Sequence, residues 1–136
     1  SGCCRVLADL TDLPMDYART GQVVSTHLLK TQPQFLGQHL KALIEGIYVY
    51  KTRPSVVLEV YRELGMNDSD AAKQTYERIV KSLREYPIPE AKGVQAVLNS
   101  LQHPKARGSK AADFIDSSLL EKIKASGFID RLYGRK

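Results

Sequence analysis

The sequence contains no tryptophan, and its 136 residues include only two cysteines and three histidines. Cys3 and Cys4 are neighbours in the chain, and because adjacent cysteines rarely bridge, an intrachain disulfide framework is excluded. Two adjacent sulfurs, without further ligands at the spacings of zinc sites, also make a poor metal site. We therefore expect no bound metal and no cofactor. We interpret Cys3 and Cys4 as small apolar residues, which leaves open a disulfide between two molecules.

Long apolar runs are also missing. No stretch approaches the ~20 residues of a transmembrane helix, and the chain does not open with the charged and apolar segments of a signal peptide. The 20 lysines and arginines outnumber the 15 acidic residues, which gives a net charge of +5. The basic residues are scattered along the chain and are denser only at 105–110 and at the last two residues. Because nucleic-acid binding needs a clustered basic surface, we expect neither a nucleic-acid partner nor membrane insertion.

Two short stretches near the N-terminus have the composition of β-strands. Residues 3–8 are a compact apolar run, and residues 22–29 are rich in β-branched side chains. The segment between them holds proline, glycine and several aspartates, which predicts a loop. Because two strands alone form a marginal sheet, we expect this pair to recruit further strands or to cover a helical body.

The rest of the chain predicts helices over residues 33–51, 55–64, 68–85, 90–102 and 117–126, with a last turn at 129–133. Thr31 and Gln34 can form a capping box for the first of these, and Pro33 suits its first turn. The predicted fold class is α+β and helix-dominated, with two short N-terminal strands followed by five or six helices, in one domain over 1–136. The side chains that recur at helical spacing and should form the core are Leu40, Leu43, Ile47, Val60, Ile79, Leu83, Val97 and Leu98.

The sequence carries no self-evident catalytic motif. No cysteine or serine stands at a spacing that suggests a histidine-activated nucleophile, and the glycines form no phosphate-binding pattern. His39 lies at the edge of an apolar helical face, where histidines are usually structural, whereas His27 points to the face of its predicted strand opposite both neighbours. We therefore expect no enzyme.

The predicted first loop holds the remaining candidates for chemistry. Asp9, Asp12 and Asp16 cluster there, and paired carboxylates can transfer protons or bind cations. Their spacing does not match an EF-hand, however, and loop aspartates commonly form turns. Tyr17 lies in the same loop, where an aromatic ring with a polar tip could line a ligand cleft.

Several motifs carry a resemblance to a known family. Residues 33–36 follow the pattern Pro-x-Phe-Leu, and residues 40–46 are Leu-Lys-Ala-Leu-Ile-Glu-Gly. The chain closes with Phe-Ile-Asp-Ser-Ser-Leu-Leu at 114–120 and Ser-Gly-Phe-Ile-Asp-Arg-Leu-Tyr at 126–133. With the order of strand, polar loop, strand and long helix, the chain resembles the C-terminal part of type II periplasmic solute-binding proteins of ABC transporters. The most similar branch is the nitrate, sulfonate, taurine and thiamine-precursor-like group.

The resemblance implies a non-catalytic binding module whose two α/β lobes close on a small ligand. Residues near 3–9 would end one lobe's sheet, residues 22–28 would be a hinge strand, and the helices would cover the other lobe. The implied ligand contacts are Asp12, Tyr17, Thr26 and His27. Because the family's N-terminal lobe is absent from this sequence, the resemblance implies a partial, fragment-like lobe that is incomplete for ligand capture alone.

The resemblance also implies the surroundings of the protein. The parent protein would bind a small anionic or organic ligand, deliver it to a transporter permease, and reside in the periplasm or outside the cell. One alternative is a free-standing helical domain that self-associates, because strand edges and apolar faces without partners recruit other chains. We would then expect a homodimer built around residues 3–9 and 22–29. Another alternative, an enzyme related to thiamine-precursor synthases, needs a cofactor-binding lobe that is absent here.

Overall fold

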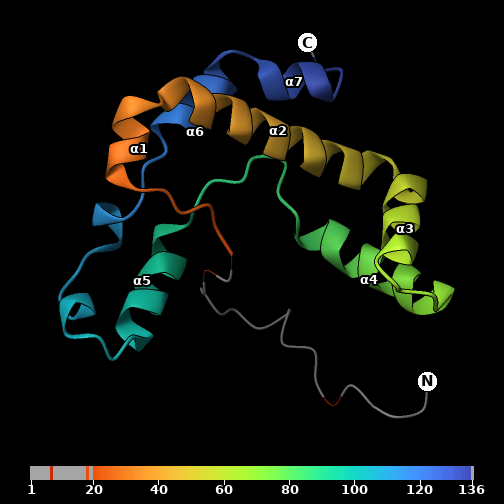
Figure 1. The fold of residues 1–136 in the computed structure, drawn as a ribbon, viewed down its shortest axis with the longest axis horizontal. Coiled ribbons are helices and arrows are strands. Elements are labelled where there is room, and N and C mark those ends of the chain that lie inside the picture. The colour runs from red at the N-terminus through yellow and green to blue at the C-terminus, as the bar shows by residue number, and fades with distance from the viewer. Residues whose placement is uncertain (1–6, 8–17, 19, 136) are drawn as a thin grey trace. The chain divides into compact units, whose positions relative to one another are not determined.

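The structure is a computed structural model that describes Leu7, Ala18 and residues 20–135 (Figure 1). These residues form seven α-helices and two short 3-10 helices, and none of them is in a β-strand. The chain divides into two compact units. One unit holds residues 22–88 and 116–136, and the other holds residues 89–115 together with the chain before residue 22.

The larger unit is built on one long helix. The helices of this unit are α1 (Thr26–Thr31), α2 (Pro33–Thr52), α3 (Pro54–Glu63), α4 (Ser69–Ser82), α6 (Ser118–Ala125) and α7 (Phe128–Leu132). Figure 1 shows α6 and α7 against α2, with α3 and α4 following from the far end of α2. The core lies where α2, α6 and α7 meet, and it contains the buried side chains Ile44, Leu120, Ile123 and Ile129.

Two prolines mark the ends of α2, and the predicted capping box of Thr31 and Gln34 is wrong. Thr31 belongs to α1, and its hydroxyl donates to the His27 carbonyl at 2.9 Å. The N-cap of α2 is Gln32, which makes no side-chain capping bond, and Pro33 occupies the first turn. The helix ends at Thr52 because Pro54 forces Arg53 out of helical geometry, to φ −127° and ψ 70°.

Helices α3 and α4 are separated by a turn at a glycine. Gly65 has a φ of +91°, which favours glycine, and the Met66 N–H donates to the Tyr61 carbonyl at 2.9 Å. Asp68 then caps α4, because its carboxylate accepts the N–H groups of Asp70 and Ala71, each at 3.0 Å. These bonds stabilise the charged form, and the Ala71 N–H is the largest cause that lowers the pKa of Asp68.

The smaller unit contains α5 (Ala91–Ser100) and the 3-10 turns η2 (Pro104–Ala106) and η3 (Ala111–Asp113). The Gln95 side chain holds the loop after α5 in place. Its amide nitrogen donates to the Ser109 carbonyl at 3.1 Å and to Asn99 Oδ1 at 3.0 Å, and its oxygen accepts the Ala111 N–H at 2.9 Å. Leu98 and Ala111 are buried in this unit.

The α+β prediction, with its partial lobe, is wrong for the described residues. Instead of a strand over 22–29, residues 22–25 have no regular structure and α1 begins at Thr26. Ser25 caps this helix by accepting the Leu28 N–H at 3.1 Å. A strand needs a neighbouring strand for its backbone groups, whereas a capped helix satisfies them locally. The other predicted strand, residues 3–8, lies outside the described residues except for Leu7.

The helical part of the prediction is confirmed more closely than the core. The five predicted helices correspond to α2, α3, α4, α5 and α6, with ends that differ by three residues or fewer. Ile47 and Leu98 are buried as expected, but Val60 and Ile79 are 44% and 36% exposed, so the prediction was wrong for both. The other four predicted core residues, Leu40, Leu43, Leu83 and Val97, are partly buried.

Candidate functional site

Two of the four predicted ligand residues lie in the described part of the chain. Thr26 and His27 are the first two residues of α1, and both are exposed. The Ser25 cap starts the helix at this point, which brings the two residues together at one end of α1. Asp12 and Tyr17 lie outside the described residues, as do Asp9 and Asp16. The structure therefore places only half of the predicted site.

The other histidine of this region has a structural contact. His39 Nε2 in α2 lies 3.1 Å from Gln22 Oε1, within hydrogen-bond distance. This contact joins α2 to the segment that precedes α1. Across the described residues, no group of three or more histidine, cysteine, aspartate or glutamate side chains is placed to hold a metal ion.

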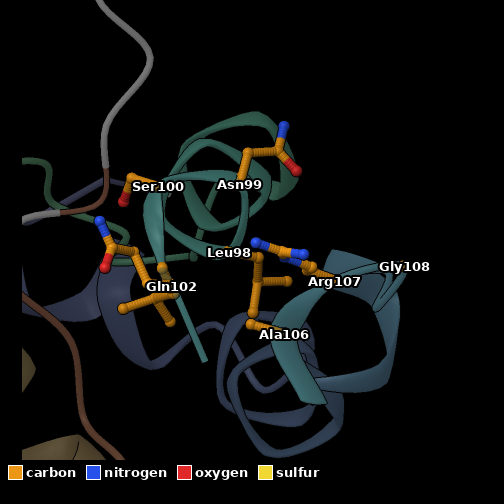
Figure 2. Close-up of a pocket in the computed structure, with 8 residues that line it drawn as sticks. Leu98, Asn99, Ser100, Gln102, Ala106, Arg107 and Gly108 are labelled. Carbon is orange, nitrogen blue, oxygen red and sulfur yellow. The ribbon is translucent and has the colours of Figure 1, made fainter. Parts of the chain in front are cut away.

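The smaller unit contains a surface hollow of about 460 Å³ at the C-terminal end of α5 (Figure 2). Its lining comes from α5 and the loop that follows: Leu98, Asn99, Ser100, Leu101, Gln102, Ala106, Arg107 and Gly108. Arg107 is the one ionisable side chain in this lining. The Ser100 hydroxyl donates to the Val97 carbonyl at 2.8 Å, so it is engaged within the helix, and no base among the described residues is hydrogen-bonded to it. The hollow has polar groups for contact but no arrangement for acid–base or nucleophilic chemistry.

Three tyrosines meet at the junction of α2, α3 and α4. The hydroxyls of Tyr50 and Tyr61 form a hydrogen bond, and the ring of Tyr76 stacks on that of Tyr50 with a centroid separation of 5.5 Å. Burial raises the pKa of Tyr50, and the bond with Tyr61 raises it further. Tyr50 therefore stays protonated at neutral pH, and this cluster packs helices rather than transferring protons.

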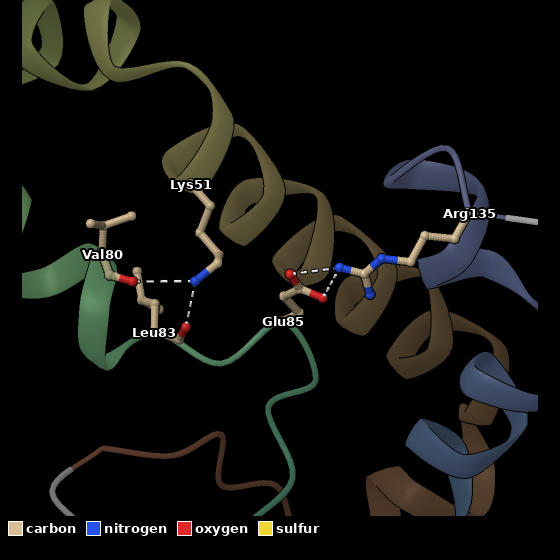
Figure 3. A network of polar contacts seen from close by, with 5 residues as sticks. All are labelled: Lys51, Val80, Leu83, Glu85 and Arg135. Atoms are coloured by element: carbon tan, nitrogen blue, oxygen red, sulfur yellow. Dashed lines mark hydrogen bonds and ion pairs between the residues drawn. The ribbon is translucent and has the colours of Figure 1, made fainter.

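Polar contacts between distant segments hold the larger unit together (Figure 3). Lys51 Nζ donates to the carbonyls of Leu83 at 2.9 Å and Val80 at 3.2 Å, at the C-terminal end of α4. A cation is favourable there because the last helical carbonyls lack partners within the helix. Arg135 pairs with Glu85 at 2.8 Å. Sequence reasoning missed these contacts, because no local pattern marks residues that are so far apart in the chain.

Tyr86 connects the segment after α4 to α6. Its hydroxyl donates to Glu121 Oε1 at 2.9 Å, and Lys124 Nζ lies 4.9 Å from its ring centroid. Burial is the main cause that raises the pKa of Tyr86 to about 12, and the neighbouring Glu121 carboxylate adds to it. Tyr86 therefore stays protonated at physiological pH and donates its hydroxyl hydrogen to α6.

No family model, curated protein or solved structure matches the chain. None of the described helices combines the length and the apolar character that a membrane crossing requires.

Proposed function

We propose that the chain is a non-catalytic domain related to the solute-binding components of ABC transporters. The observation that carries this proposal is the packing of the segments on which the sequence resemblance rests. Residues 40–46, 114–120 and 126–133 are far apart in the chain, yet Ile44, Leu120 and Ile129, one from each segment, belong to one buried cluster. If the motifs matched the family by chance, they would not need to pack together. Their shared cluster therefore supports the view that they belong to one structural unit.

The proposed role is to support a binding site rather than to form one alone. The ligand would be a small anionic or organic solute, and the partner of the full-length protein would be a transporter permease in the periplasm or outside the cell. Thr26 and His27 are exposed at the start of α1 and are thus available as ligand contacts. Asp12 and Tyr17 are proposed as further contacts on the resemblance alone.

A genetic uptake experiment tests the proposal. The gene should lie beside permease and ATPase genes, and its deletion should abolish uptake of one solute from a panel of labelled nitrate, taurine, alkanesulfonates and aminopyrimidines. Wild-type protein and Glu45→Gln should restore uptake. Ile44→Asp should not, because a carboxylate would be buried in the core without a partner. Unchanged uptake after deletion, at a locus without transporter genes, would overturn the proposal.

A second candidate function is self-association as a helical interaction domain. The observation that favours it is the exposure of apolar side chains near the start of the larger unit. Val23 is 95% exposed, Val24 43% and Phe35 60%. Strand pairing through residues 26–29 no longer supports such a dimer, because these residues are helical. The proposed contact therefore consists of residues 3–9, which lie outside the described residues except for Leu7, together with the non-helical residues 22–25 and the apolar side chains beside them.

A further inference from the structure

Helix α3 is amphipathic, and its apolar surface is wider than the part that the protein buries. Val57 is buried, and Leu58 and Tyr61 are partly buried. Val56, Val60 and Leu64 follow one another at steps of four residues and lie beside the buried side chains on the helix surface, and we call these three residues the α3 apolar face. They are 41%, 44% and 80% exposed. Exposed apolar side chains that lie near one another commonly mark an interaction surface, and the described residues leave this face partly uncovered.

One edge of the α3 apolar face is acidic. Glu59 and Glu63 come three residues after Val56 and Val60, and this spacing puts both carboxylates beside the face. Neither forms an ion pair or hydrogen bond within the described part of the chain. Arg62 is two residues from both Val60 and Leu64, and it therefore lies on the opposite side of the helix.

The chain segment that carries this face is acidic, although the chain as a whole is basic. Residues 55–70 contain four carboxylates, those of Glu59, Glu63, Asp68 and Asp70, against the single guanidinium of Arg62, whereas the whole chain has a net charge of +5. Charge of one sign beside an apolar contact selects a partner of the opposite sign. The cover that fits this face is apolar at its centre and basic at its edge.

We propose that the α3 apolar face binds a basic amphipathic helix of a partner protein. From Val56 to Leu64 the face extends about 12 Å at 1.5 Å per residue, which is two helical turns. A partner helix would place apolar side chains at helical spacing on Val56, Val60 and Leu64, with lysine or arginine facing Glu59 and Glu63. This proposal does not depend on the transport-related function.

Two other occupants fit the charges less well. A second copy that paired its α3 antiparallel across a two-fold axis through Val60 would bring the edge with Glu59 and Glu63 against the same edge of its partner. The carboxylates would then repel one another. An anionic lipid surface would be repelled by the same carboxylates. Because the face is only two turns long, we expect a weak and transient complex rather than a permanent one.

Fluorescence anisotropy with the full chain tests the proposal. The probe is a labelled helical peptide of about 14 residues made of leucine and lysine at helical spacing, and its control has glutamate in place of lysine. We expect the lysine peptide to bind with a Kd on the order of 10 µM at low salt, and more weakly at high salt. The glutamate peptide should bind at least about tenfold more weakly.

Matched variants on α3 locate the binding face. Val60→Asp should weaken binding of the lysine peptide by about tenfold or more, because it puts a charge at the centre of the contact. The double variant Glu59→Gln/Glu63→Gln should keep the fold and remove most of the salt dependence. Arg62→Gln, on the opposite side of the same helix, should leave the Kd unchanged. Circular dichroism of each variant checks that the helices are retained.

Four outcomes overturn the proposal. Equal binding of the two peptides, or an unchanged Kd with both Val60→Asp and Glu59→Gln/Glu63→Gln, would show that the α3 apolar face does not select a basic helix. A dimer of the chain that Leu64→Asp dissociates would assign the face to a second copy. Binding to phosphatidylglycerol vesicles that Val60→Asp abolishes would assign it to a membrane surface.

Discussion

At the scale of single residues, the core depends on Ile44. This side chain is 1% exposed and lies among Leu120, Ile123 and Ile129, which come from α6 and α7. Its neighbour Leu43, one residue earlier in α2, is only partly buried. Two adjacent apolar residues of one helix thus occupy different environments, and they should contribute differently to stability.

We predict that Ile44→Ala lowers the free energy of unfolding by about 2–5 kcal/mol, because the buried site cannot close completely around the cavity. Leu43→Ala should cost much less, on the order of 1 kcal/mol, since part of that side chain already contacts water. Urea denaturation of the two variants beside wild type measures the difference. Equal losses would contradict the distinction between the two positions.

Asp68 gives a prediction about pH. Its pKa is lowered from 3.8 by the N–H groups that it accepts, the Ala71 N–H first. A carboxyl whose folded pKa is depressed stabilises the fold above its unfolded pKa, and this contribution is lost as the pH falls through the folded pKa. Asp68→Ala should therefore lower the Tm at pH 7 but leave it nearly unchanged once the pH has fallen below the depressed folded pKa of Asp68.

Asp68→Asn is the matched control for this prediction. An asparagine side chain can still accept the N–H groups of α4, but it does not titrate. Its Tm should stay near the wild-type value at pH 7, and the acid-dependent loss should be smaller than in wild type. A wild-type and an Asp68→Ala protein that lose Tm in parallel between pH 5 and pH 3 would count against the capping role.

At the scale of elements, α4 is held at its C-terminal end by a side chain from α2. Lys51 donates to the Leu83 and Val80 carbonyls, and this is the point where α4 has no further helical N–H groups to offer them. The bonds join two helices that are separated by α3 in the chain. They therefore fix the hairpin of α3 and α4 against the end of α2.

We predict that Lys51→Met lowers the free energy of unfolding by about 0.5–1.5 kcal/mol, because methionine keeps much of the packing but offers no donor. The exchange of the Leu83 amide hydrogen, which bonds to the Ile79 carbonyl, should also become faster. The control is Lys81→Met, because Lys81 is exposed in the last turn of α4. Equal effects of the two variants would mean that the carbonyl contacts do not stabilise α4.

The helices could be predicted from the sequence because their signals are local. Pro54 and Gly65 act on neighbouring backbone groups, and each lies at a helix end that the structure contains. The strand over residues 22–29 was wrong because β-branched composition indicates a strand only where another strand supplies hydrogen bonds. Residues 26–31 instead form a short helix that Ser25 caps.

Periodicity was less informative about which face of a helix is buried. In α3 and α4 the apolar faces read from the sequence contain Val57 and Ala72, which the structure buries, but they also contain Val60 and Ile79, which it leaves exposed. A helical repeat shows that apolar residues share a face, but the packing partner decides which face is covered. The prediction of the candidate site had the same limit. Thr26 and His27 could be proposed as single residues, but contacts such as Lys51 with Val80 join segments that are distant in the sequence.

At the scale of the whole molecule, the chain exposes apolar side chains in more than one place. Val23 and Val24 precede α1, and Val60 lies on the α3 apolar face. Exposed apolar residues that lie near one another commonly mark interfaces. The two regions lead to separate proposals, because residues 22–25 favour a second copy of the chain whereas the acidic edge of α3 favours a basic partner.

The last prediction separates these two regions by oligomeric state. If self-association is the function, light scattering at micromolar concentration should give a mass near twice 15.2 kDa that falls on dilution. Val24→Lys should shift the protein to the monomer, because a lysine at the contact must give up water or repel its symmetric copy. Val60→Lys, on α3, should leave the dimer intact. A mass of 15.2 kDa at every concentration would reject the dimer and the second candidate function, and it would leave the transport-related proposal and the α3 apolar face to their own experiments.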